Sequence, residues 1–254
     1  MRSLIFCMKK TLIFILFICY NYGLSQQIVP AWFKKMPDPG NGINLAVGYT
    51  GKFRDKKLAK KVALNQARKN MAKQLRIRLI FEIKEMSDGH YRLIQPTFEQ
   101  IYYENVQNYV DNCSFILDSA FVDDRYYILL ATDEEFKVPG GGLATWGPKP
   151  VWTDNLPEEQ EYAYGIGIVA NYSYWKNGWR DADEYARFDA CKNLEIRNSS
   201  IRTEKRTDEY TINRKVMRQS VDMAVANSKI IERWYDMQRD VYYSLCRIPI
   251  SSNK

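Results

Sequence analysis

The feature that most constrains the fold is a set of landmarks that occurs twice, about 120 residues apart. Each set has a tryptophan, a proline, a short apolar segment ending in glycine, and alanines spaced every four residues. The residues are Trp32, Pro37, Gly48, Ala59, Ala63 and Ala67 in the first half, and Trp152, Pro157, Gly165, Ala182, Ala186 and Ala190 in the second. A period this long predicts two similar domains rather than a solenoid of short units.

Each half is expected to be an α+β domain, in which a long alanine-striped helix and a second helix pack on a mostly antiparallel sheet. Alanines four residues apart place small side chains on one helix face, which can then lie close to a sheet. Asp55 can cap the first long helix. Asp181 and Glu184 form a variant capping box for the second. We therefore expect the order strand, long helix, strand, second helix and two closing strands in each half.

The later parts of the halves also align. One offset pairs Val106, Val110 and Asn112 with Val221, Val225 and Asn227. After a gap of one residue, 126–130 align with 242–246, and both segments begin with two tyrosines, which alternate with aliphatic residues as strand residues do. Coincidence is the alternative, but it would have to reproduce the order and spacing of all these landmarks. The pattern predicts an ancestral duplication.

Two segments lie outside the predicted domains, 26–136 and 151–254. Residues 137–150 concentrate glycine and proline and are predicted to be an interdomain linker. Residues 1–25 resemble a signal peptide, with Lys9 and Lys10 before an apolar run and small residues up to Ser25, although Met8 could also be the start. The apolar run of about ten residues is shorter than the roughly 20 that span a bilayer, which disfavours a membrane anchor.

Charge and cysteine content narrow the class of protein. The chain carries a net charge of +7, of which Arg2, Lys9 and Lys10 contribute three, and residues 151–254 balance 16 basic against 16 acidic residues. This balance argues against a nucleic-acid partner. The predicted mature chain keeps three cysteines, an odd number that excludes complete internal pairing. Cys191 and Cys246 are expected to be small buried hydrophobic residues.

These landmarks resemble the bacterial LPP-twenty lipoprotein family and the related N-terminal domain of flagellar assembly protein T. The resemblance rests on the Trp and Pro before a Gly-ended strand and on the helix with alanines every four residues, and it covers 30–134 and 150–249. It implies an α+β domain in the cell envelope and brings no catalytic residues to this chain. The chain departs from the family because Cys19 follows Phe17 and Ile18 rather than small residues, so a lipid anchor is not expected.

Motifs for catalysis are sparse. His90 is the only histidine and lies in a turn-like segment, 87–90, without the neighbours that zinc sites or nucleophilic triads need. The acidic pairs at 123–124 and 134–135 lie in or beside predicted turns, and the glycines at 165 and 167 lack the third glycine of a dinucleotide-binding motif. We predict no catalytic residues, no metal site and no cofactor.

Two surfaces are candidate binding sites. Residues 52–78 contain eleven basic residues and one acid, so Lys56, Lys57, Lys60 and Lys61 could contact an anionic surface. The alternative is an ordinary solvated helix face. Residues 171–179 are crowded with aromatic residues, so a sugar or a partner side chain could bind them. The alternative is that they cover the sheet or the junction between the halves. The candidate residues are Tyr172, Tyr174, Trp175 and Trp179.

The sequence therefore predicts an exported, non-catalytic envelope protein with a binding or scaffolding role, in the periplasm or at the outer-membrane periphery of a Gram-negative bacterium. An envelope protein or a glycan is a candidate partner, peripheral membrane contact is a further candidate, and the oligomeric state stays open. One alternative is a polysaccharide-processing or other hydrolase-like enzyme that uses carboxylates. Another is a purely structural subunit of an envelope oligomer.

Overall fold

The computed structural model describes most of the chain after the predicted signal peptide and confirms a mixed α+β fold. The residues described are 27–40, 42–85, 91–93, 99–139, 141–170, 174–204 and 218–250. The predicted signal peptide, His90 and Tyr172 lie outside these ranges, so those predictions stay as they are.

The first helix–sheet unit places one long helix on a three-stranded antiparallel sheet. It consists of β2 (Leu45–Tyr49), α3 (Lys56–Leu75), β6 (Phe115–Val122) and β7 (Arg125–Ala131), with strand order β2-β7-β6. Asp55 caps α3 as predicted, because its carboxylate accepts hydrogen bonds from two backbone N–H groups of the first turn. The predicted alanine face packs on the sheet, and Ala59, Ala63 and Ala67 are fully buried.

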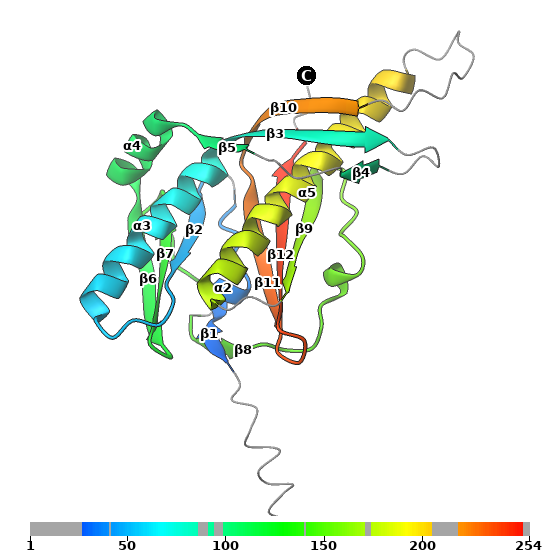
Figure 1. Ribbon diagram of the computed structural model, residues 1–254. Helices are drawn as coiled ribbons and strands as arrows, with labels where there is room; N and C mark the ends of the chain where they lie inside the picture. Colours follow the sequence, from blue (N-terminus) through cyan, green and yellow to red (C-terminus); the bar gives the residue numbers. More distant parts are fainter. Residues whose placement is uncertain are drawn as a thin grey trace, which may run out of the picture.

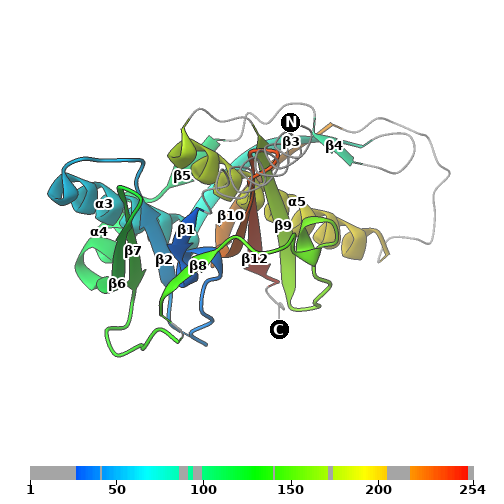
Figure 2. The same ribbon diagram turned by 90° about the horizontal axis from the view of Figure 1, so that it is seen from below.

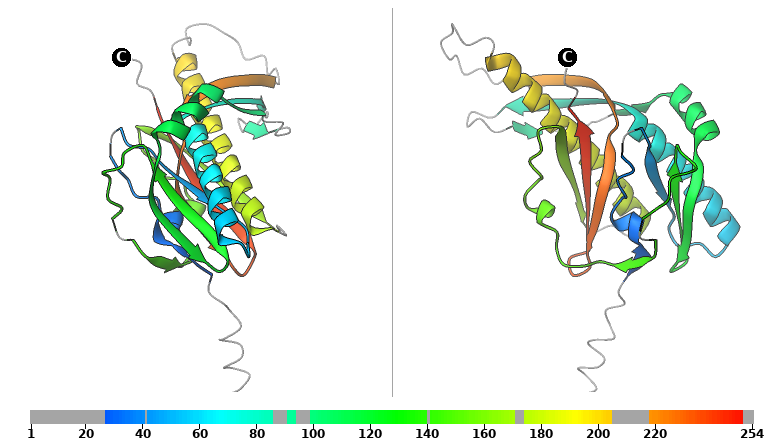
Figure 3. Two further views of the ribbon diagram at one scale, coloured as in Figure 1. Left: turned by 90° about the vertical axis from the view of Figure 1, so that its left-hand side faces the viewer. Right: turned by 180° about the vertical axis from the view of Figure 1, so that it is seen from behind.

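The second helix–sheet unit has the same arrangement. It consists of β9 (Tyr162–Ala170), α5 (Trp175–Glu204), β11 (Lys229–Asp236) and β12 (Val241–Pro249), with strand order β9-β12-β11. The predicted capping box is wrong, because α5 begins at Trp175, six residues before Asp181. The buried Trp179 extends the apolar face of the helix toward its start. Both long helices lie on the same side of the sheets and begin at the same end of the molecule (Figures 1 and 3).

The units align in a different register from the one predicted. The Cβ of an alanine at Gly48 would lie 1.9 Å from the carbonyl oxygen of Ala63, and one at Gly167 would lie 1.9 Å from that of Ala182. Gly48 and Gly167 also pair with equivalent positions of β7 and β12, namely Ile128 and Ser244. Ala63 therefore corresponds to Ala182, one helical turn from the predicted partner Ala186. Because alanines recur at every turn, their spacing cannot distinguish neighbouring registers.

A third sheet joins the two units. Its strands are β3 (Arg76–Glu85), β4 (Tyr91–Leu93), β5 (Glu99–Tyr102) and β10 (Arg218–Ala226), and β3 pairs with each of the other three. Beyond it, α4 (Glu104–Cys113) packs on α3. The second helix predicted near Val221 and Val225 is wrong, since these residues lie in β10, whereas Val106 and Val110 lie in α4. This segment forms a strand because its nine residues pair with β3. With a helix in one half and a strand in the other, duplication of the whole halves is not confirmed.

The two units share one core. Between them lie β1 (Ile28–Pro30), α2 (Ala31–Lys34) and β8 (Leu143–Thr145), and β1 pairs with β8 (Figure 2). One hydrophobic cluster contains Phe33 and Trp146 together with residues of both units, such as Leu129, Trp179 and Leu245. The segment predicted to be a linker therefore contains β8 and a buried tryptophan. It leads to the 3-10 helix η1 (Val151–Thr153).

Two further predictions concern membranes and cysteines. Among the residues described, no helix is both long and apolar enough to cross a membrane. Cys191 and Cys246 are fully buried, as predicted, and both are free thiols. Burial raises the pKa of both thiols, that of Cys246 to about 12, so these groups stay protonated near neutral pH.

Candidate functional site

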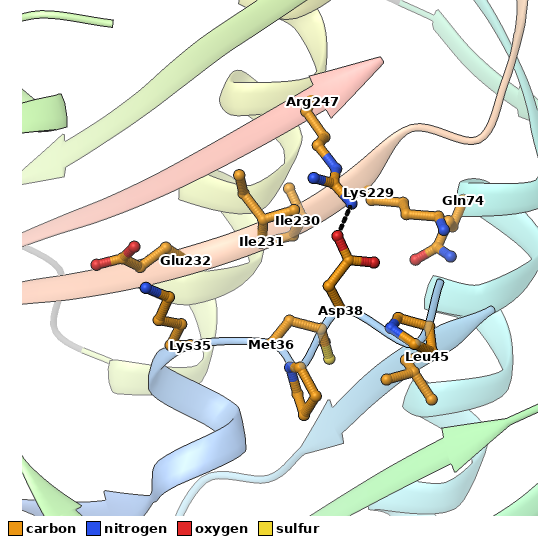
Figure 4. Close-up of a pocket in the computed structure, with 12 residues that line it drawn as sticks. Lys35, Met36, Asp38, Leu45, Gln74, Lys229, Ile230, Ile231, Glu232 and Arg247 are labelled. Atoms are coloured by element: carbon orange, nitrogen blue, oxygen red, sulfur yellow. Dashed lines mark hydrogen bonds and ion pairs between the residues drawn. The ribbon is translucent and has the colours of Figure 1, made fainter. Parts of the chain in front are cut away.

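A cavity of about 180 Å³ lies at the junction of the two units (Figure 4). Its walls come from the extended segment 35–39, from β2, from the end of α3, and from the adjoining ends of β11 and β12. A second recess, of about 230 Å³, lies beside it and is bounded by Gly40, by residues 42–44, and by Tyr162, Asn227 and Pro249. Lys229 and Arg247 line both cavities, so their side chains form the wall between them.

Strand pairing explains why these two cations lie together. Lys229 begins β11 and Arg247 lies near the end of β12, and the antiparallel register places them directly opposite each other. Cross-strand partners project from the same face of a sheet. That face is turned toward the segment after α2, where Pro37 and Pro39 flank Asp38. The sheet therefore brings two cations to an opening bordered by a backbone segment of the other half.

Asp38 partly neutralises the positive charge of Lys229 and Arg247. Its carboxylate oxygen Oδ2 accepts a hydrogen bond of 2.8 Å from a terminal guanidinium nitrogen of Arg247, and its Oδ1 accepts one from the backbone N–H of Gly40. The hydrogen bond from Arg247 lowers the pKa of Asp38, although burial opposes this. Burial and the neighbouring Arg247 lower the pKa of Lys229, while Asp38 opposes that shift. An added anion would therefore relieve the repulsion between the two cations.

Arg247 also has a free hydrogen-bond donor. Its guanidinium lies over the Tyr162 ring, 4.8 Å from the ring centre, in a cation–π contact. Its Nε is buried and has no hydrogen-bond partner within the part of the chain that the structure describes. Buried donors in folded proteins are nearly always satisfied by protein or by ordered water, so this group is available to an acceptor from outside the chain, either water or a ligand.

The two cavities differ in character. Apolar side chains of Met36, Pro37, Leu45 and Ile231 wall the first cavity, together with Lys35 and Glu232 at one end. In Figure 4, Lys35 and Glu232 lie apart from the group formed by Asp38, Lys229 and Arg247. The second recess is lined by the polar side chains of Asn44, Asn227 and Tyr162. The arrangement suits a small anion that carries an apolar group.

The first cavity holds few carboxylates among the described residues. Asp38 and Glu232 are the carboxylates among the described residues that line the first cavity. A general acid would need a raised pKa, whereas the pKa of Asp38 is lowered. The residues described hold no group of three His, Cys, Asp or Glu side chains arranged to bind a metal ion.

Beneath this junction lies a buried ion pair that sequence reasoning missed. Arg233 donates hydrogen bonds of 3.0 and 2.8 Å to the two carboxylate oxygens of Asp183, and a third to the carbonyl oxygen of Phe33. The Ser244 hydroxyl donates to the same carboxylate at 2.7 Å. The Arg233 and Asp183 side chains are only 3% and 4% exposed. The pair links α5, β11 and the end of α2, and so fixes the position of the segment that leads into the cavity wall.

The predicted aromatic site is divided between core and surface. Trp179 is fully buried, and it stacks on Trp146 with ring centroids 5.3 Å apart. Trp175 is half-buried, stacks on Phe33 at 5.8 Å, and carries the guanidinium of Arg125 on its face. These contacts support the alternative that the tryptophans cover the junction between the halves. Tyr174 is 72% exposed, and Tyr172 lies outside the described residues.

The predicted basic site lies on the surface, far from the cavity. Lys56, Lys57, Lys60 and Lys61 are all exposed on the first turns of α3. Lys56 lies 4.7 Å from the centre of the Phe121 ring. The structure therefore separates the two predicted surfaces from the junction cavity, which the sequence analysis did not identify. The one signal for that cavity is the presence of cations within the apolar segments 229–235 and 241–249.

Comparison with known proteins gives no relative. No family model, no curated protein sequence and no solved structure matches this chain.

Proposed function

We propose that the protein is a non-catalytic binding protein whose junction cavity holds a small organic anion with an apolar substituent. The observation that carries the proposal is the pair of cations that line both cavities. One of them, Arg247, has a buried donor with no partner among the described residues. A carboxylate between Lys229 and Arg247 would satisfy that donor and offset the repulsion between the cations. The apolar wall would then accept the rest of the molecule.

The cellular setting is part of the same proposal. The leader-like residues 1–25 and the resemblance to the LPP-twenty lipoproteins support an exported protein at the cell envelope, in the periplasm or at the outer-membrane periphery. A binding or scaffolding role suits the closed core shared by the two units. The hydrolase-like alternative lacks support in the cavity, because the pKa of Asp38 is shifted in the wrong direction for a general acid.

Titration calorimetry with simple carboxylates tests the proposal. Hexanoate should bind the intact protein, acetate should bind more weakly because it lacks the apolar chain, and uncharged hexanamide should not bind measurably. Arg247→Gln should weaken hexanoate binding by about tenfold or more, since a charge-assisted hydrogen bond contributes roughly 1.5–3 kcal/mol. Lys229→Gln should also weaken it.

Arg239→Gln is the matched control. Arg239 lies at the turn between β11 and β12, at the opposite end of the same strands, and its side chain is 75% exposed. This variant should bind hexanoate as the unmodified protein does. Equal affinity for hexanoate and hexanamide, or an unchanged affinity in both cavity variants, would exclude an anion site at the junction.

A further inference from the structure

A strongly basic surface lies at the end of the molecule where both long helices begin. In and before α3, exposed basic residues come from 52–61, and α5 adds two more near its start. We call this surface the basic end, and its cations are Lys52, Arg54, Lys56, Lys57, Lys60, Lys61, Lys176 and Arg180. Only the lysines on α3 were predicted from the sequence as a candidate basic surface.

Packing brings the two parts of the basic end together. The guanidinium of Arg125 lies on the ring of Trp175 at the start of α5, while Lys56 at the start of α3 lies on Phe121. Arg125 and Phe121 belong to the same β6–β7 hairpin. Figures 1 and 3 show both helices beginning beside this hairpin. The starts of the two helices also interact electrostatically. Burial is the main cause of the lowered pKa of Lys176, and the positive charges of Arg180 and of Lys69 in α3 lower it further.

Little of this charge is neutralised locally. Among the residues described, no carboxylate lies within ion-pairing distance of Lys56, Lys57, Lys60 or Lys61. Two of the acids nearby have other partners, because Asp55 accepts the capping hydrogen bonds of α3 and Asp181 pairs with Arg180. A third acid, Asp124, lies beside Lys52 and Arg54, since its carbonyl oxygen accepts a hydrogen bond from the N–H of Phe53. Asp123 lies 4.0 Å from Arg125. The surface therefore keeps a net positive charge.

Exposed apolar groups accompany the cations. Tyr174, directly before α5, is 72% exposed, and Leu58, in the first turn of α3, is 48% exposed. An amphipathic ring beside lysines is typical of the interface between membrane and water, where the ring enters the headgroup layer and the cations meet lipid phosphates. We infer that the basic end docks on a bilayer containing anionic phospholipids.

This orientation is compatible with ligand binding. Gln74, near the end of α3, lines the junction cavity, and an α-helix rises 1.5 Å per residue. The cavity therefore lies about 27 Å along α3 from Lys56. A molecule held by its basic end keeps the cavity open on the side away from the lipid.

Vesicle cosedimentation tests the inference with the protein as it is. Protein should sediment with vesicles of phosphatidylcholine mixed with phosphatidylglycerol, and should stay in solution with phosphatidylcholine alone. Binding should fall as salt rises, because exposed charges are screened over about 10 Å at 0.1 M. Equal binding to both kinds of vesicle, or no binding to either, would overturn the inference.

Two variants separate the contributions. K57Q/K60Q/K61Q leaves Lys56 on Phe121 and should weaken binding by about a hundredfold, since each of the three lysines near an anionic surface contributes roughly 1 kcal/mol. Tyr174→Ser should weaken binding severalfold at every salt concentration. The matched control is R76Q/K149Q/K192Q, which removes the same charge away from the helix starts and should change binding little. If the control weakens binding as much as K57Q/K60Q/K61Q, net charge alone explains it and the docking surface is wrong.

Vesicle binding and hexanoate binding are expected to be independent, because they use different residues. Arg247→Gln should keep vesicle binding, and K57Q/K60Q/K61Q should keep hexanoate binding. Failure of one experiment therefore leaves the other conclusion standing.

Discussion

The two helix–sheet units are most alike where the helix meets the sheet. In each, a glycine of the first strand lies against the backbone of the long helix, and the third strand has an irregularity at the same place, beside Leu117 in β6 and Ile231 in β11. Even the polar contacts correspond, since the Asn70 amide donates to the carbonyl oxygen of Val47 and Asp189 accepts from the N–H of Ile166. Close packing of backbone on backbone leaves little freedom for change.

The units differ where they meet. At the outer edge of β11, the segment after α2 covers the strand, because the N–H of Met36 donates a hydrogen bond to the carbonyl oxygen of Ile231. In the corresponding region of β6, a side chain satisfies a backbone group instead. The carboxylate of Asp118 accepts a hydrogen bond from the N–H of Ser119. Both arrangements satisfy edge groups that could otherwise pair with another strand. The arrangement in the second unit forms part of the cavity wall, since it places the segment 35–39 beside β11.

The buried ion pair is the largest chemical difference between the units. The positions in the first unit that correspond to Asp183 and Arg233 are Leu64 and Ser119, which cannot form such a pair. Asp183→Ala should lower the free energy of unfolding by about 3–5 kcal/mol, because it leaves the Arg233 charge buried without its partner. Urea unfolding measures the change.

Ser119→Ala is the control for this prediction. Its side chain is exposed, so the substitution should change the free energy of unfolding by no more than about 0.5 kcal/mol. A loss below about 1 kcal/mol for Asp183→Ala would mean that water reaches the pair and that the junction is less closed than the structure shows.

The glycine contacts test whether the units are equivalent. In Gly48→Ala and Gly167→Ala the added Cβ would lie 1.9 Å from a helix carbonyl oxygen, so backbone has to shift in both units. Each variant should lose about 1–3 kcal/mol of stability, as overpacked cores do. Thermal and urea unfolding of the two variants should give similar losses.

Gly51→Ala is the matched control, because a Cβ there has no atom within 4 Å. It should be close to neutral. A large loss for only one of Gly48→Ala and Gly167→Ala would break the alignment of the two units.

The fold class followed from local patterns, and these patterns were strong where the core is regular. The alanines on one helix face, the glycine of the first strand and the paired tyrosines each lie in the kind of element expected, although β2 and β9 continue past Gly48 and Gly165. The sequence failed at Val221 and Val225, whose spacing also fits a helix. Their pairing with β3, far away in the chain, outweighs local preference.

The candidate site could not be found from the sequence for a related reason. Asp38 and Arg247 form an ion pair across 209 positions of the chain, and no local spacing reports such a contact. Tyr174 and the α3 lysines of the basic end were predicted as parts of two separate surfaces, because each group clusters in sequence. Trp175 and Trp179 cluster as well, but composition alone cannot tell a stacking surface from a core, and burial of Trp179 decided it.

The smallest predicted change in stability concerns the ion pair between Asp38 and Arg247 at the junction cavity. Asp38→Asn should change the free energy of unfolding by less than about 1 kcal/mol, because the Asp38 side chain is 61% exposed and such pairs contribute little. Hexanoate should nevertheless bind more tightly, since the ligand no longer competes with Asp38 for Arg247. Calorimetry at neutral pH measures both affinities, and weaker binding by the variant would contradict the assignment of Arg247 as the anion ligand.

The pH dependence of stability completes this test. The pKa of Asp38 is lowered in the folded protein, so its pair with Arg247 stabilises the fold above the unfolded pKa of about 3.9. That contribution is lost as the pH falls through the lower folded pKa. The small stability difference between the protein and Asp38→Asn should therefore be present at pH 7 and shrink in strong acid. A difference that instead grew below pH 4 would mean that Asp38 is held by something other than the Arg247 charge.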